Sequence, residues 1–155
     1  MKVLLGYDSH RLIEQVPSTI TLGGIKIKSN YKVLAHSDGD VIAHALIDAL
    51  APIILNKSIG ELYSDKDESS KGASSIKRLE EVYKLCLSPS IINIDIVVQT
   101  DEVNISNVKD QIKNNISKVL NLPSENIGIK GKTTEGIYSS PLIQVWCVML
   151  IDGGF

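Results

Sequence analysis

The three histidines of this chain fall in two short segments, and no other feature constrains the fold as strongly. His10 ends the segment Tyr7-Asp8-Ser9-His10, whereas His36 and His44 flank a Ser-Asp-Gly-Asp stretch. Imidazole nitrogen and carboxylate oxygen are common ligands of zinc, and three protein ligands leave a fourth position for substrate or water. If both segments build one site, the amino-terminal strand must pack against the helix that follows residue 40.

The composition predicts one domain spanning residues 1–155. With 155 residues, of which 43% are hydrophobic, the chain can bury one sizeable core. A net charge of -2 without basic blocks makes nucleic acid an unsuitable partner. The longest apolar runs are too short for membrane helices and no signal peptide is recognisable, so we expect a soluble protein without a membrane partner. Cys86 and Cys147 lack CxxC spacing, and we expect buried free thiols.

The hydrophobic pattern predicts an α+β fold: a mixed four-stranded sheet with helices on one face, plus a small hairpin. Residues 58–70 are polar and form a predicted surface loop. The predicted strands are 2–7, two within 19–28 joined by a Gly-Gly turn, 91–99, 127–130 and 142–151. The predicted helices are one that follows residue 40, 73–87 and 108–120.

The spacing of Asp8, His10 and His44 favours a metal site. Two residues apart on a strand, Asp8 and His10 project from the same face. His44 shares a helix face with Asp40 and Asp48, at spacings of four residues. Unconnected polar residues remain an equally open interpretation. Asp48 is either a structural hydrogen-bond acceptor or a solvated helix position, and we expect the latter.

Two further segments predict contacts with phosphate. His36 and Ser37 precede a helix, whose terminal amides favour anions, although a helix cap explains them too. Residues 130–136 combine lysine, hydroxyl and carboxylate groups, which suit a diphosphate and its divalent ion. An ordinary polar turn has much the same composition.

Together these motifs closely resemble the 2-C-methyl-D-erythritol 2,4-cyclodiphosphate synthase family over essentially the whole chain. The matching segments are 6–10, 22–24, 34–50, 59–60, 64–67, 71–72 and 132–135. The resemblance implies an intramolecular phosphoryl transfer in the non-mevalonate route to isoprenoid precursors. The 2-phosphate of 4-diphosphocytidyl-2-C-methyl-D-erythritol 2-phosphate attacks the β-phosphorus, which releases CMP and closes the cyclodiphosphate.

The resemblance also implies the site residues. Asp8, His10 and His44 are the implied zinc ligands, and Glu135 the implied magnesium or manganese ligand. His36 and Thr133 are the implied catalytic residues, while Asp40 has a supporting role near substrate hydroxyls or at the helix start. The implied substrate-binding residues are Asp8, Ser9, His10, His36, Ser37, Ser58, Ile59, Gly60, Tyr63, Ser64, Asp65, Lys66, Asp67, Lys132, Thr133, Thr134, Glu135 and Tyr138.

The resemblance further implies a homotrimer, with sheets packed around its axis and active sites between subunits. Ile94, Ile96, Val98 and residues 145–150 are expected to supply apolar packing on the uncovered sheet face. The implied location is the cytoplasm of a bacterium, or the plastid stroma for a processed eukaryotic form.

Three departures from the family pattern concern substrate contacts. Ser58 stands where the family has an acidic ribose ligand, residues 99–104 lack the usual Pro-Lys, and residues 136–141 form a shorter loop without arginine. These changes motivate one alternative, a catalytically silent metal- and cytidine-nucleotide-binding homologue. A generic metal phosphohydrolase is a third hypothesis.

Overall fold

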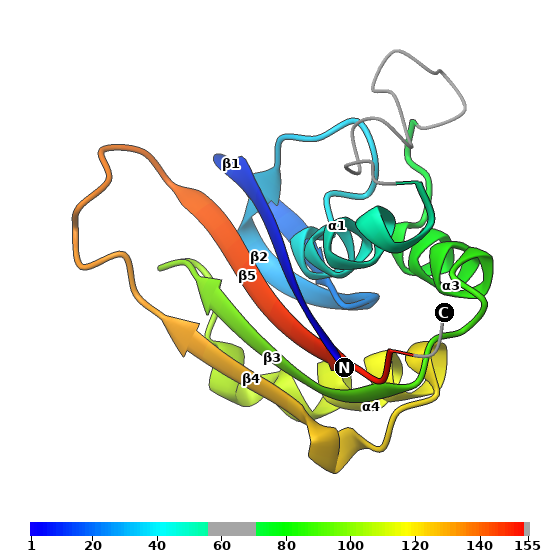
Figure 1. Ribbon diagram of the computed structural model, residues 1–155. Helices are drawn as coiled ribbons and strands as arrows, with labels where there is room; N and C mark the ends of the chain where they lie inside the picture. The colour runs from blue at the N-terminus through cyan, green and yellow to red at the C-terminus, as the bar shows by residue number, and fades with distance from the viewer. Residues whose placement is uncertain (56–70, 154–155) are drawn as a thin grey trace.

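The protein is an α+β fold around one mixed five-stranded sheet, seen in a computed structural model that describes residues 1–55 and 71–153 (Figure 1). The strand order is β2-β1-β5-β3-β4. Only the pair β3 and β4 is parallel among these neighbours. The strands are β1 Lys2–Leu22, β2 Ile25–Val33, β3 Ile91–Gln99, β4 Ile127–Lys132 and β5 Leu142–Ile151. The predicted fold class is confirmed.

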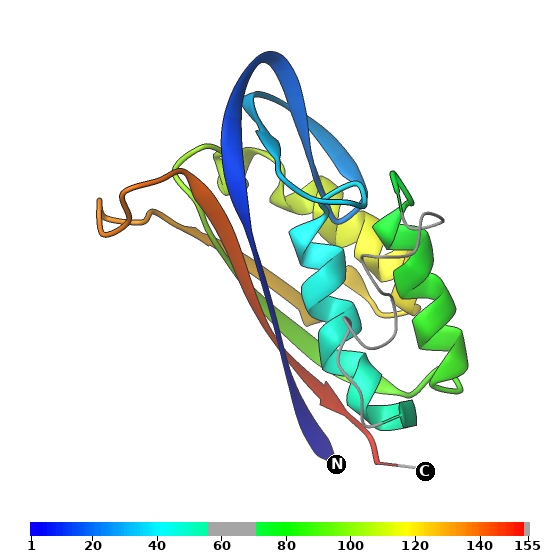
Figure 2. The same ribbon diagram turned by 90° about the horizontal axis from the view of Figure 1, so that it is seen from above.

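The helices α1, α3 and α4 cover one face of the sheet (Figure 2). Their bounds are Val41–Leu55, Ser75–Leu85 and Lys109–Leu120, and short 3-10 helices span Ile105–Asn107 and Ser124–Asn126. The core lies between these helices and the sheet, where Leu46, Leu79 and Ile112 are fully buried. No helix in the described part of the chain is long and apolar enough to cross a bilayer.

Strand β1 differs from the prediction because it is one 21-residue strand rather than a short strand followed by a separate hairpin. Lys2–Arg11 pair with β5, and Leu12–Leu22 pair with β2. The hairpin therefore adds a fifth strand to the sheet. The residues between the two predicted strands are largely exposed, and the pairing register shifts between Glu14 and Ser18, so the periodic burial that predicts a strand is lost there.

The face of the sheet opposite the helices is exposed and partly apolar. Along β1, Val3, Leu5 and Tyr7 alternate with inward-facing residues and are 69%, 64% and 42% exposed. The prediction that Ile94, Ile96 and Val98 lie on this face is wrong, because all three are buried in the core. Asn93 and Asp95 alternate with these residues, so the sequence identifies the apolar face of β3 but not that the helices are what cover it.

Candidate metal centre

The close packing of β1 against α1 builds the centre. Gly6 is buried in β1 and leaves room for the backbone of α1. The Asp48 carboxylate of α1 then accepts a hydrogen bond of 3.1 Å from the backbone N–H of Tyr7. Asp48 is half-buried and links helix to strand, so the structure favours the alternative of a structural acceptor over the expected solvated position. The same alignment carries Asp8 to His44, one turn earlier on α1.

The side chains of Asp8, His10 and His44 converge on one point. Asp8 Oδ2 lies 3.1 Å from His10 Nε2 and 3.0 Å from His44 Nδ1. One ligand atom from each residue falls within 4.8 Å of the others. The side chains are 21%, 22% and 12% exposed, so a ligand can still reach them from one side. The convergence predicted from spacing is confirmed, and two imidazoles with one carboxylate fit an open zinc-type centre.

The electrostatics keep Asp8 in its ionised form. Burial alone would raise the pKa of this carboxyl, but its close interactions with the His10 and His44 rings outweigh burial and lower the pKa to about 2. Ionised carboxylate is the form that coordinates metals.

The orientation of His10 is set by a backbone carbonyl. Its Nδ1 lies 3.2 Å from the carbonyl oxygen of Leu34. A carbonyl only accepts, so Nδ1 carries the proton and Nε2 is the nitrogen that faces Asp8. Strand β1 therefore presents His10 through Nε2, whereas α1 presents His44 through Nδ1.

Asp40 caps α1 and is completely buried. Its Oδ1 accepts hydrogen bonds from Gly23 N at 2.8 Å and Ala43 N at 3.0 Å, and its Oδ2 accepts one from Gly24 N at 2.7 Å. Asp40 was predicted either near the substrate hydroxyls or at the helix start. The position at the helix start is confirmed, and because its side chain is completely buried, Asp40 cannot contact substrate. Because Asp40 also occupies the amide of Ala43, that amide is not free for the phosphate contact predicted at this helix start.

Two residues that sequence analysis did not assign to the site connect α1 to α3. Ser75 Oγ lies 2.8 Å from His44 Nε2, and Asp38 binds both the hydroxyl and the backbone N–H of Ser75. The only available signals were the position of Ser75 at the start of an amphipathic helix and that of Asp38 within the histidine motif.

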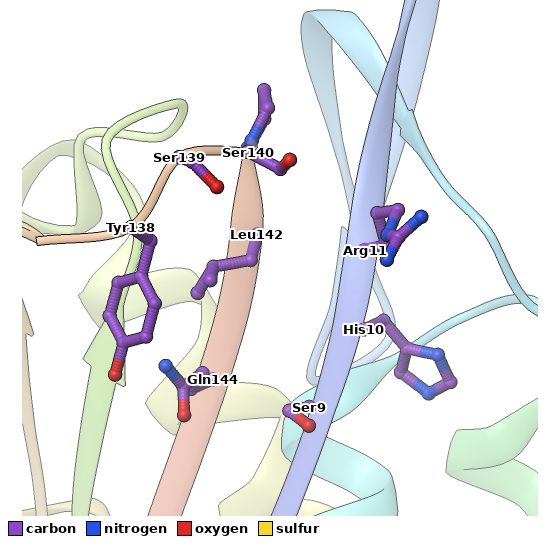
Figure 3. A pocket seen from close by; sticks show the side chains of 9 residues that line it. Ser9, His10, Arg11, Tyr138, Ser139, Ser140, Leu142 and Gln144 are labelled. Atoms are coloured by element: carbon purple, nitrogen blue, oxygen red, sulfur yellow. The ribbon is translucent and has the colours of Figure 1, made fainter.

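The other predicted substrate-binding residues near the metal centre do not all face it. Ser37 Oγ lies 3.1 Å from His44 Nε2, and the His36 side chain is exposed. Ser9 lies on the opposite face of β1 from Asp8 and His10, by strand alternation. Ser9 also lines a pocket of about 510 Å³, together with His10 and Arg11 among others. Figure 3 shows Tyr138 across this pocket, away from the His10 ring.

A second cluster forms where β4 ends. Thr133 Oγ1 donates to Glu135 Oε1 at 2.6 Å, and both side chains are exposed. Thr134 is 5% exposed, and its N–H and hydroxyl both donate to Asp101. Asp101, which sequence analysis did not single out, thus fixes the loop that presents Thr133 and Glu135.

This cluster lies apart from the metal centre within one chain. Ser9, Gln144, Gln99 and Lys132 occupy one row across β1, β5, β3 and β4. Three strand spacings amount to about 14 Å. Among the described residues, Glu135 is accordingly absent from the group around Asp8. The remaining predicted site residues, Ser58, Ile59, Gly60, Tyr63, Ser64, Asp65, Lys66 and Asp67, lie outside the described residues.

Comparisons with known proteins decide the family. The model of the YgbB family matches residues 1–152. The chain belongs to the YgbB family. A curated relative from Aquifex aeolicus, named 2-C-methyl-D-erythritol 2,4-cyclodiphosphate synthase, is 34% identical over 97% of both chains. A relative of the same name from Caldicellulosiruptor bescii is 40% identical, covering 88% of this chain and 87% of that one.

Solved structures agree with this family assignment. A 2C-methyl-D-erythritol-2,4-cyclodiphosphate synthase in its CDP-bound form matches with a TM-score of 0.86 and 33% identity, covering 97% of this chain and all of the other. The resemblance inferred from the motifs is therefore confirmed over nearly the full length.

Proposed function

We propose that this YgbB-family protein converts 4-diphosphocytidyl-2-C-methyl-D-erythritol 2-phosphate into 2-C-methyl-D-erythritol 2,4-cyclodiphosphate and CMP. It would thus be a cyclising phosphorus-oxygen lyase of the non-mevalonate isoprenoid route. The observation that carries the proposal is the convergence of Asp8, His10 and His44 in a chain whose curated relatives bear that enzyme's name.

The donor atoms fit the metals that this function requires. Asp8, His10 and His44 would hold zinc, and Glu135 would hold magnesium or manganese together with the substrate's phosphates. When bound, these ions neutralise and align phosphate oxygens that otherwise repel one another.

The reaction requires the protein mainly to position the two reacting phosphates, because the nucleophile is part of the substrate itself. An oxygen of the 2-phosphate forms a bond to the β-phosphorus, while the bond from β-phosphorus to the bridging oxygen breaks and CMP leaves with that oxygen. His36 and Thr133 would orient the reacting phosphates, with Ser37 and Lys132 as further contacts. Residues 58–60 and 63–67, with Tyr138 and Glu135, complete the proposed substrate contacts.

A pocket beside the loop cluster suits the cytidine group. It measures about 370 Å³ and is lined by Asp101, Val103, Asn104, Lys132 and Thr133, among others. Backbone groups in this segment can read the base without the Pro-Lys that the family usually has. The CDP-bound relative supports a cytidine nucleotide as the ligand.

A homotrimer would unite the two clusters. The metal centre and the Thr133–Glu135 cluster lie three strands apart in one chain. A single subunit would therefore not bring the two halves of the proposed site together. The exposed sheet face carries Val3, Leu5 and Val148, together with a Tyr7 and Trp146 ring pair 5.3 Å apart. Packing three such faces around an axis would cover this apolar surface and set each metal centre beside the next subunit's loop.

Turnover with metal analysis tests the proposal. The zinc-loaded protein with magnesium should release CMP and cyclic product from the diphosphocytidyl substrate. His44→Ala should lose both zinc and turnover, whereas the matched variant His36→Ala should keep zinc and lose turnover. Full zinc occupancy without any turnover would support the silent homologue, and inorganic phosphate or open-chain products would support a phosphohydrolase.

A further inference from the structure

A chain of hydrogen bonds runs from the metal centre into the start of α3. His44 Nε2 lies 2.8 Å from Ser75 Oγ, and Ser75 Oγ lies 2.5 Å from Asp38 Oδ1. Ser75 is fully buried, and its backbone N–H also donates to Asp38 Oδ2 at 3.0 Å. The three residues come from α1, the loop before it and α3.

Counting protons fixes the direction of these bonds. A carboxylate only accepts, so the single hydroxyl proton of Ser75 points to Asp38. Ser75 Oγ can then only accept from His44, which places a proton on Nε2. The nitrogen left for a metal is Nδ1, which is the one that faces Asp8 at 3.0 Å.

We infer that Ser75 and Asp38 are positioning residues for the metal ligand His44, holding its ring in the tautomer and orientation that direct Nδ1 to the ion. The inference rests on the metal centre of the proposed function. Carboxylate partners of metal-bound histidines usually act directly, whereas here a buried serine transmits the effect of Asp38. Ser37 Oγ, at 3.1 Å from Nε2, is a second and longer acceptor.

Backbone hydrogen bonds between two segments hold this arrangement together. Gly72 N donates to His36 O at 2.9 Å, and Asp38 N donates to Ala73 O at 3.3 Å. The N-cap residue of α3, Ser74, makes no side-chain capping bond, and Asp38 from the other loop binds the first helical N–H instead. The residue that caps α3 is therefore the one that orients His44 through Ser75.

Zinc affinity of the whole protein without substrate, measured against a chromophoric chelator, tests the inference. Ser75→Ala should weaken zinc binding about 10- to 100-fold, the range seen for such outer partners. Ser74→Ala, at the neighbouring position, should leave it unchanged. In the zinc-loaded protein, the Nε2 proton of His44 should exchange slowly with water in the wild type and faster in Ser75→Ala, as seen in proton-nitrogen NMR spectra.

A second variant covers the case in which Ser75→Ala does not fold. Asp38→Asn introduces an amide that can donate to Ser75 Oγ, which frees the serine proton to point at His44 Nε2 and favours the wrong tautomer. Zinc binding should weaken here as well. If folded variants of both residues bind zinc like Ser74→Ala, with unchanged proton exchange, the inference is overturned while the metal centre stands. If His44→Ala also retains zinc, the metal centre itself is wrong.

Discussion

Gly6 of β1 lies directly against Ala45 of α1, with no room for a side chain between them. A Cβ on Gly6 would lie 1.9 Å from the carbonyl oxygen of Ala45 and 2.8 Å from the backbone nitrogen of Ala49. Both atoms belong to helix backbone, which cannot move alone. This contact sets the distance between the strand that carries Asp8 and the helix that carries His44.

Gly6→Ala should therefore damage both stability and the metal centre. Overpacking usually costs 1–3 kcal/mol, and we expect about 3 kcal/mol here because the clash is with backbone. Displacing α1 should also separate His44 from Asp8, so zinc affinity should fall even where the variant remains folded. Urea unfolding and zinc titration on the same preparation measure the two effects.

Gly72→Ala is the matched control for this prediction. Gly72 has a φ of +68°, but nothing lies within 4 Å of an added Cβ. The cost should be about 1 kcal/mol from the left-handed backbone alone, with zinc affinity retained. Equal losses in the two variants would contradict the view that close packing places the metal centre.

The buried carboxyl of Asp40 should make the protein less stable as the pH rises. Burial raises the pKa of its carboxyl to about 6, despite hydrogen bonds from Ala43, Gly24 and Gly23. Between about pH 4 and pH 6 the folded protein then binds a proton that the unfolded chain has released. The contribution of Asp40 to the free energy of unfolding therefore falls as the pH rises through this window, by up to about 3 kcal/mol.

Comparison with Asp40→Asn isolates this effect. The variant should be less stable at every pH, because its amide cannot accept all three N–H bonds. Its deficit should shrink as the pH rises from 4 to 7, since only the wild type has the titrating group. Working above pH 4 avoids Asp8, whose lowered pKa stabilises the fold above about 4 and ceases to do so as the pH falls through 2. Urea unfolding at each pH measures this deficit. If the deficit grows with pH, hydrogen bonding to the Asp40 carboxylate lowers its pKa more than burial raises it.

The sequence predicted those parts of the site in which local spacing determines direction. Asp8 and His10 are two apart on a strand, and His44 faces them one helix turn before Asp48. Ser75 and Asp38 escaped prediction because their bond depends on how two loops dock, which no periodicity records. Similarly, β3 and β5 were located correctly and the apolar face of β3 is evident from its alternation, but that helices from elsewhere in the chain cover this face is not recorded in the strand.

Asp101→Ala should release the loop that carries Thr133 and Glu135. Asp101 is exposed and binds the N–H and hydroxyl of Thr134, and these bonds lower the pKa of its carboxyl. Without it, we expect turnover to fall about 10-fold or more, because small misplacements of positioning groups are costly. Zinc affinity should not change, since none of the proposed zinc ligands Asp8, His10 and His44 belongs to this loop. Asp110→Ala, an exposed change on α4, should alter neither quantity. A parallel loss of zinc in Asp101→Ala would contradict the assignment of zinc binding to Asp8, His10 and His44 alone.

Mixing two inactive variants should restore activity if the site is shared between subunits. Asp8→Ala removes the metal half of the site, and Glu135→Ala removes the loop half, so each protein alone should be inactive. In randomly mixed trimers, a site has an intact metal half with probability one half and an intact loop half with the same probability, giving up to about a quarter of wild-type activity. The variants are unfolded together, refolded and assayed for CMP release, with separately refolded samples combined afterwards as the control. Activity that stays at the level of that control would place both halves of the site within one chain, in conflict with the three strands that separate them.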